Sequence, residues 1–536
     1  MACRQSICRP PLRYVSFFYL EVVVDRKWWT LIAVLIGVFM LLLDVTIVNV
    51  ALPDIQRDLD SSFSDLQWVV NAYALTLAST LLVSGSVADV IGRRRVFVTG
   101  LFVFTIASLG CGSVGTPLHL NLLRGVQGIG AGMMFATSLA LIAQAFQGRE
   151  RGIAFGAFGA VTGASVAVGP VIGGVLTDSF GWQAVFLVNI PVGIFAVALT
   201  LAKVSESRDS NPAGIDFPGA VTLTGSLFLL IFALVRGNDA GWGSTQIVGF
   251  LVGAAVLLAA FVVLETRRDN PLFDLSLMRK PAFLGASLAA FCLSASMFAM
   301  FLYLTLYMQG VLDYSPLETG LRFLPLSLLS FLVGPIAGQL SEKVPVRWLM
   351  GGGLLLVTFG LLLMHGVTSS ADWTTLLAGF LVAGVGIGLV NPPLASTAIG
   401  VVEQRRSGMA SGVNTTFRQV GLATGIAGLG AIFQHRVGST IADGLAGTPA
   451  SGRADQFADA VSAGATEKAA AAAPGPMRGQ LIDLGHQAFI NGMNTLLLVT
   501  AGVAIVGAIG SAILVRQRDF VVHGAPAPPE AQEVAA

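Results

Sequence analysis

Residues 28–50 read WWTLIAVLIGVFMLLLDVTIVNV, an apolar run interrupted by a single carboxylate, Asp44. A helix of about 20 such residues crosses the roughly 30 Å hydrocarbon core of a bilayer, because each residue adds 1.5 Å. The whole chain of 536 residues is similarly apolar, with 54% hydrophobic residues, 11% charged residues and a mean hydropathy of +0.77. A soluble protein of this size needs far more surface charge. The sequence therefore predicts a membrane protein.

Apolar runs recur along almost the whole chain. Membrane β-barrels show segments of about ten residues with alternating hydrophobicity, and this sequence lacks them. Helix is the other structure that satisfies every backbone group in lipid. We count fourteen runs, centred on residues 28–50, 67–88, 96–115, 120–145, 153–176, 184–202, 218–236, 246–265, 283–308, 319–339, 348–366, 375–398, 409–433 and 489–515. The prediction is an all-α membrane protein with fourteen spans.

The distribution of Lys and Arg predicts how these spans are oriented. If both termini are cytoplasmic, the segments on that side hold 22 of the 31 basic residues, and the outer segments hold seven. Cytoplasmic loops of membrane proteins carry such an excess. We therefore expect a multi-pass protein of the cytoplasmic (inner) cell membrane, with both termini in the cytoplasm.

Three pairs of similar segments indicate two related halves. They are GIGAG at 128–132 with GVGIG at 384–388, GIAFG at 152–156 with GMASG at 408–412, and GSVAD at 85–89 with GQLSE at 338–342. The offset between the members of a pair is 256 residues in the first two pairs and 253 in the third. Two halves of six spans leave two surplus spans, and repeated halves around a central cavity are typical of transporters.

The repeat and the runs divide the chain into five parts. The long loop at 434–488 is rich in Ala, Gly and Ser, and we expect one helix in it, over residues 454–473. The parts are a cytoplasmic extension (1–27), an N-terminal six-helix bundle (28–203), a linker with two extra transmembrane helices (204–280), a C-terminal six-helix bundle that includes the loop (281–515) and a disordered cytoplasmic tail (516–536).

Several motifs stand in a fixed order along the chain. They are LDVTIVNVALP at 43–53, GSVADVIGRRR at 85–95, RGVQGIGA at 124–131, GASVAVGPVIGG at 163–174, GWQAVFLVNIP at 181–191 and Asp216-x-x-Gly219. In this order they resemble the signatures of the major facilitator superfamily, in its fourteen-span drug:proton antiporter branch. The resemblance extends from about residue 28 to residue 515, and it implies the major-facilitator-type fold with two inserted transmembrane helices.

Asp44 and Arg124 are the candidates for proton coupling. A charged side chain near mid-membrane costs roughly 2.5–3.5 kcal/mol on insertion scales, so its retention indicates a function. A carboxylate that gains and loses a proton could exchange that proton for a polar or cationic compound, and the resemblance implies that Arg124 takes part in proton transfer. The alternatives are hydrogen bonds from Asp44 to the span end, Thr46 or Asn49, and a purely structural role for Arg124.

The resemblance also implies two gating elements. The first is the loop after span two, where the alternative is a topology signal alone, and its residues are Gly85, Asp89, Gly92, Arg93 and Arg94. The second is the small, kinkable face of span five, where the alternative is ordinary close packing of helices. The residues of that antiporter motif are Gly163, Gly169, Pro170, Gly173 and Gly174.

Aromatic, Met and polar side chains within the spans are candidates for a substrate cavity, because such side chains accept bulky ligands without strict geometry. Each one singly has packing or a place in the interfacial belt as its alternative. Arg418 either faces the substrate or extends to the cytoplasmic edge. The candidates are Trp68, Asn71, Tyr73, Met300, Tyr303, Tyr307, Asn391 and Arg418.

Other classes of function find little support. Every Lys follows Arg, Ala or Glu, so the Gly-Lys of a phosphate-binding loop is absent, and the five His and four Cys lack metal or catalytic spacing. We expect a monomeric, proton-coupled exporter of lipophilic, cationic or amphiphilic drugs that uses the proton gradient and no cofactor, ATP, metal or nucleic acid. Two alternatives remain: a dedicated exporter of an endogenous metabolite or self-made antibiotic, and a membrane sensor that transports nothing.

Overall fold

The computed structural model describes residues 25–146, 148–208, 216–268, 271, 273–341, 343–368, 372–402, 407–448, 450–471, 473, 475–516 and 519–520. Most of the predicted extension at 1–27, the tail after residue 520 and Glu342 of the repeat therefore lie outside the described residues. Within them the chain forms helices and no strand.

The helices follow one another with short connections. They are α1 (Arg26–Leu59), α2 (Phe63–Ile91), α3 (Arg93–Cys111), α4 (Pro117–Ala145), α5 (Gly148–Phe180), α6 (Ala184–Leu187), α7 (Asn189–Lys203), α8 (Phe217–Ala240), α9 (Thr245–Arg267), the 3₁₀-helix η1 (Leu275–Arg279), α10 (Pro281–Leu293), the π-helix η2 (Ser294–Phe298), α11 (Ala299–Gly310), α12 (Pro316–Leu340), α13 (Val346–Leu363), α14 (Thr374–Gly400), α15 (Ser407–Leu445), the 3₁₀-helix η4 (Ser451–Arg453), α16 (Ala454–Ser462), α17 (Thr466–Ala470) and α18 (Gly475–Leu514).

Polar residues in the connections fix where several helices begin. The Ser62 hydroxyl oxygen accepts a hydrogen bond from the backbone N–H of Asp65, and the Asp65 carboxylate accepts one from the backbone N–H of Ser62. This capping box starts α2. Ser315 and Glu318 start α12 in the same way. Asp216 caps α8, which explains why an acidic residue precedes the inserted helices.

Among the residues that the structure describes, eleven helices, some of them two joined elements, are long and apolar enough to span a membrane. The number is thirteen if the bent helices α2 and α5 each count as one span. The bend in α5, of 42°, separates Ile153–Ser165 from Ala167–Phe180. Pro170 explains this bend, since it has no N–H to bond to the carbonyl one turn earlier. The thirteenth predicted span, at 409–433, lies in α15, which is long enough but is not among the thirteen helices that pass, so the number fourteen stays a prediction.

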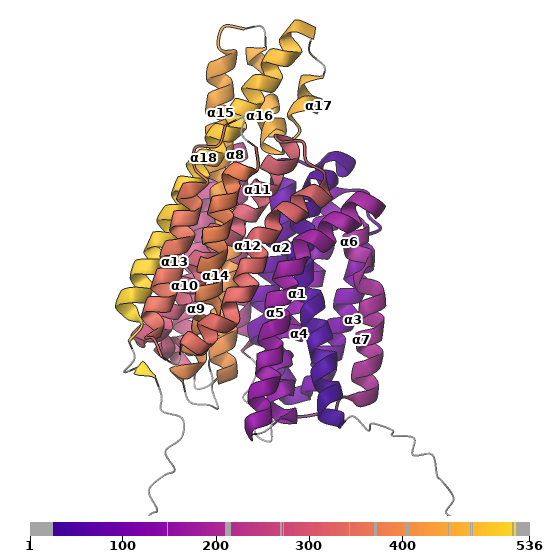
Figure 1. Cartoon of the computed structure of the whole chain (residues 1–536), viewed down its shortest axis with the longest axis vertical. Coiled ribbons are helices and arrows are strands. Elements are labelled where there is room, and N and C mark those ends of the chain that lie inside the picture. The colour runs from indigo at the N-terminus through magenta and orange to yellow at the C-terminus, as the bar shows by residue number, and fades with distance from the viewer. Residues whose placement is uncertain are drawn as a thin grey trace, which may run out of the picture.

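The helices before residue 204 and those after residue 280 form two bundles that stand side by side (Figure 1). They meet where α5 packs on α12, α2 on α15, and α1 on α11. The inserted helices α8 and α9 pack on each other, and α8 also contacts α2 and α15. The inserted helices therefore lie against both bundles, beside the contact between α2 and α15.

The buried side chains form two apolar clusters of different extent. The smaller cluster stays within the first bundle, around Val34, Phe97 and Met134. The larger one joins Ile47 and Phe63 of the first bundle to most of the second. Outward-facing residues are apolar as well, as in α9, whose Val248, Val252 and Val256 are 45%, 56% and 60% exposed. Such a stripe suits lipid, not water.

One end of the molecule carries a helical projection, and we call this end the α16 end. There α15 and α18 continue past the bundles, with α16 and α17 beside them (Figure 1). The single helix predicted over 454–473 is wrong, because Gly464 has a φ of +81° and separates two short helices. Lys468, after this turn, forms an ion pair of 2.8 Å with Asp60, which lowers the pKa of that carboxyl.

The repeat inferred from glycines is also visible in how the helices pack. A Cβ on Gly130 of α4 would lie 2.7 Å from the carbonyl oxygen of Gly100, and one on Gly386 of α14 would lie 2.5 Å from that of Gly353. These contacts join α4 to α3 and α14 to α13. A second pair of contacts repeats this pattern. Gly132 of α4 lies against the carbonyl oxygen of Leu77 in α2, and Gly388 of α14 lies against that of Ser330 in α12.

We predict that Gly130→Ala and Gly386→Ala each lower the free energy of unfolding by about 1–3 kcal/mol, because the new methyl group meets backbone atoms that cannot move aside. Thermal unfolding in detergent measures this effect. Gly249→Ala in α9 is the control, since no atom lies within 4 Å of its Cβ position. That variant should be neutral or slightly more stable. Equal stability of all three variants would contradict the packing argument.

Candidate functional site

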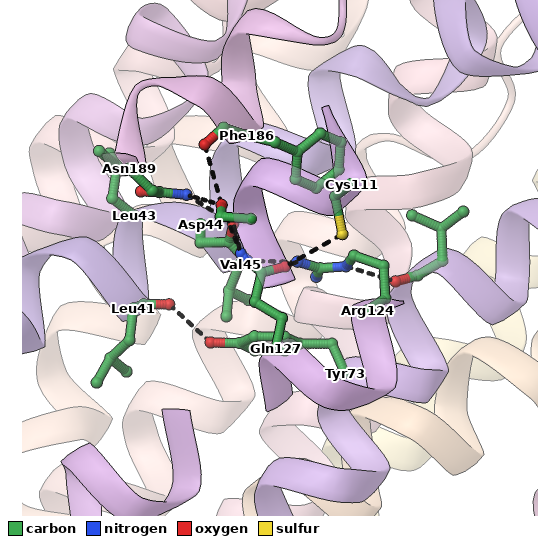
Figure 2. Close-up of polar contacts among 12 residues, drawn as sticks. Leu41, Leu43, Asp44, Val45, Tyr73, Cys111, Arg124, Gln127, Phe186 and Asn189 are labelled. Carbon is green, nitrogen blue, oxygen red and sulfur yellow. Dashed lines mark hydrogen bonds and ion pairs between the residues drawn. The ribbon is translucent and has the colours of Figure 1, made fainter. Parts of the chain in front are cut away.

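Asp44 lies in the middle of α1 and has no exposed surface. Its Oδ2 atom accepts a hydrogen bond of 2.5 Å from Nη1 of Arg124. Its Oδ1 atom accepts from Nε2 of Gln127, at 2.9 Å, and from Nδ2 of Asn189, at 3.2 Å. The carboxylate is therefore surrounded by donors from α4 and α7 (Figure 2).

Arg124, two turns into α4, is also fully buried. Its Nε atom donates to the carbonyl oxygen of Val69, at 3.0 Å, and its Nη1 atom donates to Oε1 of Gln127 as well as to Asp44. The guanidinium carbon lies 4.3 Å from the ring centroid of Tyr73, a distance that permits a cation–π interaction. The positive charge thus has a carboxylate, two neutral acceptors and an aromatic face around it.

A second layer of residues orients these partners. Oγ of Ser108 accepts 3.0 Å hydrogen bonds from Gln127 and from Asn189, and it donates to the carbonyl oxygen of Phe186. Asn189 is the first residue of α7, where the chain turns from α6. Figure 2 shows the network, which draws side chains or carbonyl groups from α1, α2, α3, α4, α6 and α7.

The predicted pair, Asp44 and Arg124, is brought into direct contact, although 80 residues separate the two in sequence. The alternative partners predicted for Asp44 bind elsewhere. Thr46 donates to the carbonyl oxygen of Leu43, and Asn49 donates to that of Val45. In α1 these two side chains therefore satisfy their own helix backbone and leave the carboxylate to donors from other helices.

Sequence reasoning missed Gln127, Asn189 and Ser108 as members of this site. Two of them carried a usable signal. Gln127 stands three residues after Arg124, so both lie on the same face of α4. Asn189 is a polar residue within an otherwise apolar run. Ser108 offered no such signal, since serine is common in membrane helices and usually bonds its own backbone.

The predicted gating loop is a tight connection between α2 and α3. Gly92 has a φ of +117°, and a Cβ there would lie 2.6 Å from the carboxyl carbon of Glu206. Asp89 pairs with Arg93 at 3.0 Å, and both belong to this connection. Several contacts join this connection to the end of α7 and the residues after it. Glu206 accepts from the backbone N–H of Arg94, whose guanidinium donates to the carbonyl oxygen of Leu201. Glu206 was not predicted.

The glycines of the predicted antiporter motif lie between α1 and α12. A Cβ on Gly169 would lie 2.6 Å from Cβ of Thr46, and one on Gly173 would lie 2.9 Å from the carbonyl oxygen of Ile47. On the other side of α5, a Cβ on Gly174 would lie 2.6 Å from the carbonyl oxygen of Pro316. This face of α5 therefore brings the backbones of both bundles close together.

Four of the eight predicted cavity residues are aromatic and make internal contacts. Trp68 stacks on two phenylalanines of the inserted α8, and the Tyr73 hydroxyl donates to the carbonyl oxygen of Leu41 beside the Asp44 network. The Tyr303 and Tyr307 hydroxyls donate to carbonyl oxygens of Ile426 and Thr368. Each of these four side chains therefore has a partner within the protein.

The other four candidates are Met300, which is fully buried, and three polar residues. Each of these three has at least one side-chain polar atom without a hydrogen-bond partner among the described residues. Both side-chain polar atoms of Asn71 and the Oδ1 atom of Asn391 are buried without a hydrogen bond. No hydrogen bond or ion pair within the described residues reaches the guanidinium of Arg418. Two surface pockets, of about 370 and about 620 Å³, are lined by none of the eight.

The Asp44–Arg124 pair is electrically neutral as a unit, which is how two charges persist in a low-dielectric interior. Adding a proton to Asp44 removes the negative partner and leaves the guanidinium uncompensated. An unpaired buried charge is costly, so protonation of such a site favours a rearrangement of the helices around it. No group of three or more His, Cys, Asp or Glu within the described ranges has the geometry of a metal site.

Known proteins show clear similarity to this chain. The Major Facilitator Superfamily profile matches residues 34–426. A multidrug resistance protein, Stp, of Mycobacterium tuberculosis is 36% identical over 77% of each chain. The tetracenomycin C resistance and export protein of Streptomyces glaucescens is 32% identical over 90% of each chain, and a puromycin resistance protein of Streptomyces alboniger is 36% identical over 78% of this chain.

A solved structure shares the fold at low sequence identity. A bacterial homologue of the human lysosomal transporter Spinster, in an inward-facing and unoccupied conformation, superposes with a TM-score of 0.64 and covers 94% of this chain at 17% identity. The helices described above, the six sequence motifs and the profile match all indicate the same family. This multi-pass membrane protein belongs to the major facilitator superfamily.

Proposed function

We propose that the protein is a proton-coupled antiporter that exports small lipophilic drugs or antibiotics across the cell membrane by alternating access. The observation that carries the proposal is the buried Asp44–Arg124 pair, with no exposed surface on Asp44 and a 2.5 Å contact between the charges. The names of three relatives, for multidrug, tetracenomycin C and puromycin resistance, support the substrate class. The proton gradient supplies the energy, without a cofactor or ATP.

In this mechanism Asp44 alternates between two sets of partners. When it is ionised, it holds Arg124, Gln127 and Asn189 together and so joins α1, α4 and α7. When it is protonated, Arg124 keeps only neutral acceptors and the Tyr73 ring. The two states therefore favour different arrangements of the bundle, and each proton taken up drives one change of conformation.

The motion has a contiguous route to the second bundle. Gly169 and Gly173 of α5 contact α1 at Thr46 and Ile47, within one turn of Asp44. The opposite side of α5 packs on α12, through Gly174 and Gly163. A shift of α1 is thus passed directly to the seam between the bundles, which is the kind of packed two-state element that couples distant sites.

We assign the present conformation to a state closed at the α16 end. Three polar contacts join residues 28–203 to residues 281–515 among those described: Gln67 to Ile426, Gln309 to Val50, and Lys468 to Asp60. All three lie toward the α16 end, and the larger apolar cluster crosses between the bundles there. With the α16 end outside and both termini in the cytoplasm, this is an inward-facing, monomeric exporter.

A dedicated exporter of one antibiotic or metabolite is the second candidate. It is favoured by the alignment over 90% of both chains with the tetracenomycin C resistance and export protein. The probable actinorhodin transporter of Streptomyces coelicolor, 34% identical over 77% of this chain, supports the same reading. Efflux of a panel of unrelated compounds separates the two: a dedicated exporter moves one chemical family only.

The first prediction of this mechanism concerns Asp44→Asn. The amide keeps the shape but takes up no proton, so proton-driven accumulation of a lipophilic drug in everted vesicles should fall to the background level. A protonophore should give the same loss in the unaltered protein. Asp58→Asn, on the same helix, is the control, because its amide oxygen still accepts from Trp182. Unchanged accumulation by the Asp44 variant would remove the central element of the proposal.

The second prediction concerns the stability of the pair. Arg124→Leu leaves a buried carboxylate without its counter-charge and should cost about 3–5 kcal/mol of unfolding free energy. Adding Asp44→Asn to that variant should recover part of this loss, since both charges are then absent. Denaturant unfolding of the single and double variants in detergent measures the difference. A double variant that is less stable than Arg124→Leu would show that the pair is not the source of the loss.

A further inference from the structure

The guanidinium of Arg418 is a charge inside the second bundle that the proposed mechanism leaves unused. Its central carbon lies 5.9 Å from the ring centroid of Phe298 in the π-helix η2. The described residues offer it no carboxylate and no hydrogen-bond acceptor. An aromatic face alone compensates a cation only in part. Arg418 is partly buried. A charge at this depth without an anion is costly, which indicates that its partner is not part of the chain.

The position of Arg418 excludes the simple alternative of reaching the membrane surface. It stands eleven residues after Ser407, the first residue of α15, which corresponds to about 16 Å of helix. Phe298, next to the guanidinium, stands 17 residues after Pro281, or about 26 Å into the span that ends at Gly310. The charge is therefore directed toward the middle of the membrane, against the most buried of the eleven unbent spans.

Two carboxamides near Arg418 also lack partners. Asn414, one turn earlier on α15, is 5% exposed, and its Nδ2 atom has no acceptor. Asn71 of α2 has no exposed surface, and neither its oxygen nor its nitrogen is bonded. The bond from Gln67 to Ile426 sets the register of these antiparallel helices. One turn further along α2, Asn71 stands opposite residue 422, about one turn from Arg418.

We propose that Arg418, Asn71 and Asn414 form the polar part of the substrate path, and that they bind an anionic oxygen, a carboxylate or a phenolate, of an otherwise apolar compound. Such a group accepts hydrogen bonds from the guanidinium and from both amides, and it neutralises the charge. Phe298 supplies an apolar ring next to the guanidinium. Asp44 is already paired with Arg124, so it has no free charge for a cationic drug.

This assignment rests on the proposed export function for its setting, and it narrows the substrate to acidic amphiphiles. The two bundles then have separate tasks. The first bundle holds Asp44, the residue that gains and loses the proton. The second bundle holds the substrate, at the seam where α2 and α15 are in contact. Of the cationic or amphiphilic substrates that the sequence predicted, the proposal selects amphiphilic compounds that carry a negative charge.

The test measures binding to the purified protein in detergent, without any gradient. Three probes share one pyrene ring: pyrenebutyrate, its neutral methyl ester, and a pyrenebutyl trimethylammonium cation. Fluorescence titration of the unaltered chain should give the tightest binding for the carboxylate, by about tenfold over the ester, since hydrogen bonds to charged groups carry such a difference. A preference for the cation, or equal binding of all three, would overturn the assignment.

Variants locate that preference. Arg418→Gln should abolish the advantage of the carboxylate over the ester and leave ester binding within about twofold, while Arg418→Lys should keep part of the advantage because it keeps the charge. Arg436→Gln, an exposed arginine of the same helix, is the matched control and should bind like the unaltered protein. Retention of the full carboxylate preference in Arg418→Gln would show that the anion binds elsewhere. Elution volume and thermal unfolding establish that each variant is folded.

The outcomes for binding and for transport are independent. If the probes bind as expected but no pH gradient moves them, the export mechanism fails and the anion site stands. If a gradient drives efflux in everted vesicles but Arg418→Gln leaves the order of probe affinities unchanged, the export mechanism stands and the anion site fails. Asn71→Ala supplies a second measure of the site, and we expect it to weaken pyrenebutyrate more than the ester.

Discussion

The ion pair between Asp44 and Arg124 is the interaction around which the first bundle is arranged. Neither charge is stable in lipid by itself, and neither has water around it, so each must find its partners on other helices. Gln127, Asn189 and Ser108 complete the set. These residues come from four different helices, so the ionised pair favours the arrangement of the helices that satisfies all of them together.

Small residues make that arrangement compact. The hydrophobic effect does not drive helices together within lipid, so close backbone contact and interhelical hydrogen bonds take its place. Gly130 and Gly386 occupy equivalent points in the two bundles, each against the backbone of the neighbouring helix. The same device, used on α5, lies between the bundles instead of within one of them. Close contact between a glycine and a neighbouring backbone thus gives rigid packing within each bundle, and at α5 it forms the proposed movable seam between the bundles.

Much of the fold could be predicted from the sequence, because lipid imposes strong rules on it. Long apolar runs predicted the helices, and glycines at a constant offset predicted two related halves, in which α4 and α14 have matching glycine contacts. The projection was predicted poorly. Residues 434–445 and 475–488 contain enough polar side chains to read as a loop, but they continue α15 and α18 as helix because they pack on each other and on α16.

The candidate site was predictable only in its charged members. Asp44 and Arg124 stand out because charges within apolar runs are rare. An amide or a hydroxyl side chain does not stand out in this way. Asn189 and Ser108 acquire their roles from a meeting of helices that no local pattern encodes. The same limit applies to Trp68, a candidate for the substrate cavity, whose contact with the inserted α8 no local pattern predicted. The role of such a residue depends on which neighbour it faces in the folded protein.

The length of α15 and α18 has a mechanical consequence. At 39 and 40 residues, each is about 60 Å long, twice the thickness of the hydrocarbon core. An unbroken helix of that length acts as a lever. If the second bundle tilts by roughly 10°, the free arm of about 30 Å carries its tip through about 5 Å. Spectroscopic labels placed there, and on the first bundle, would therefore magnify a small rotation deep in the membrane into a readable change of distance.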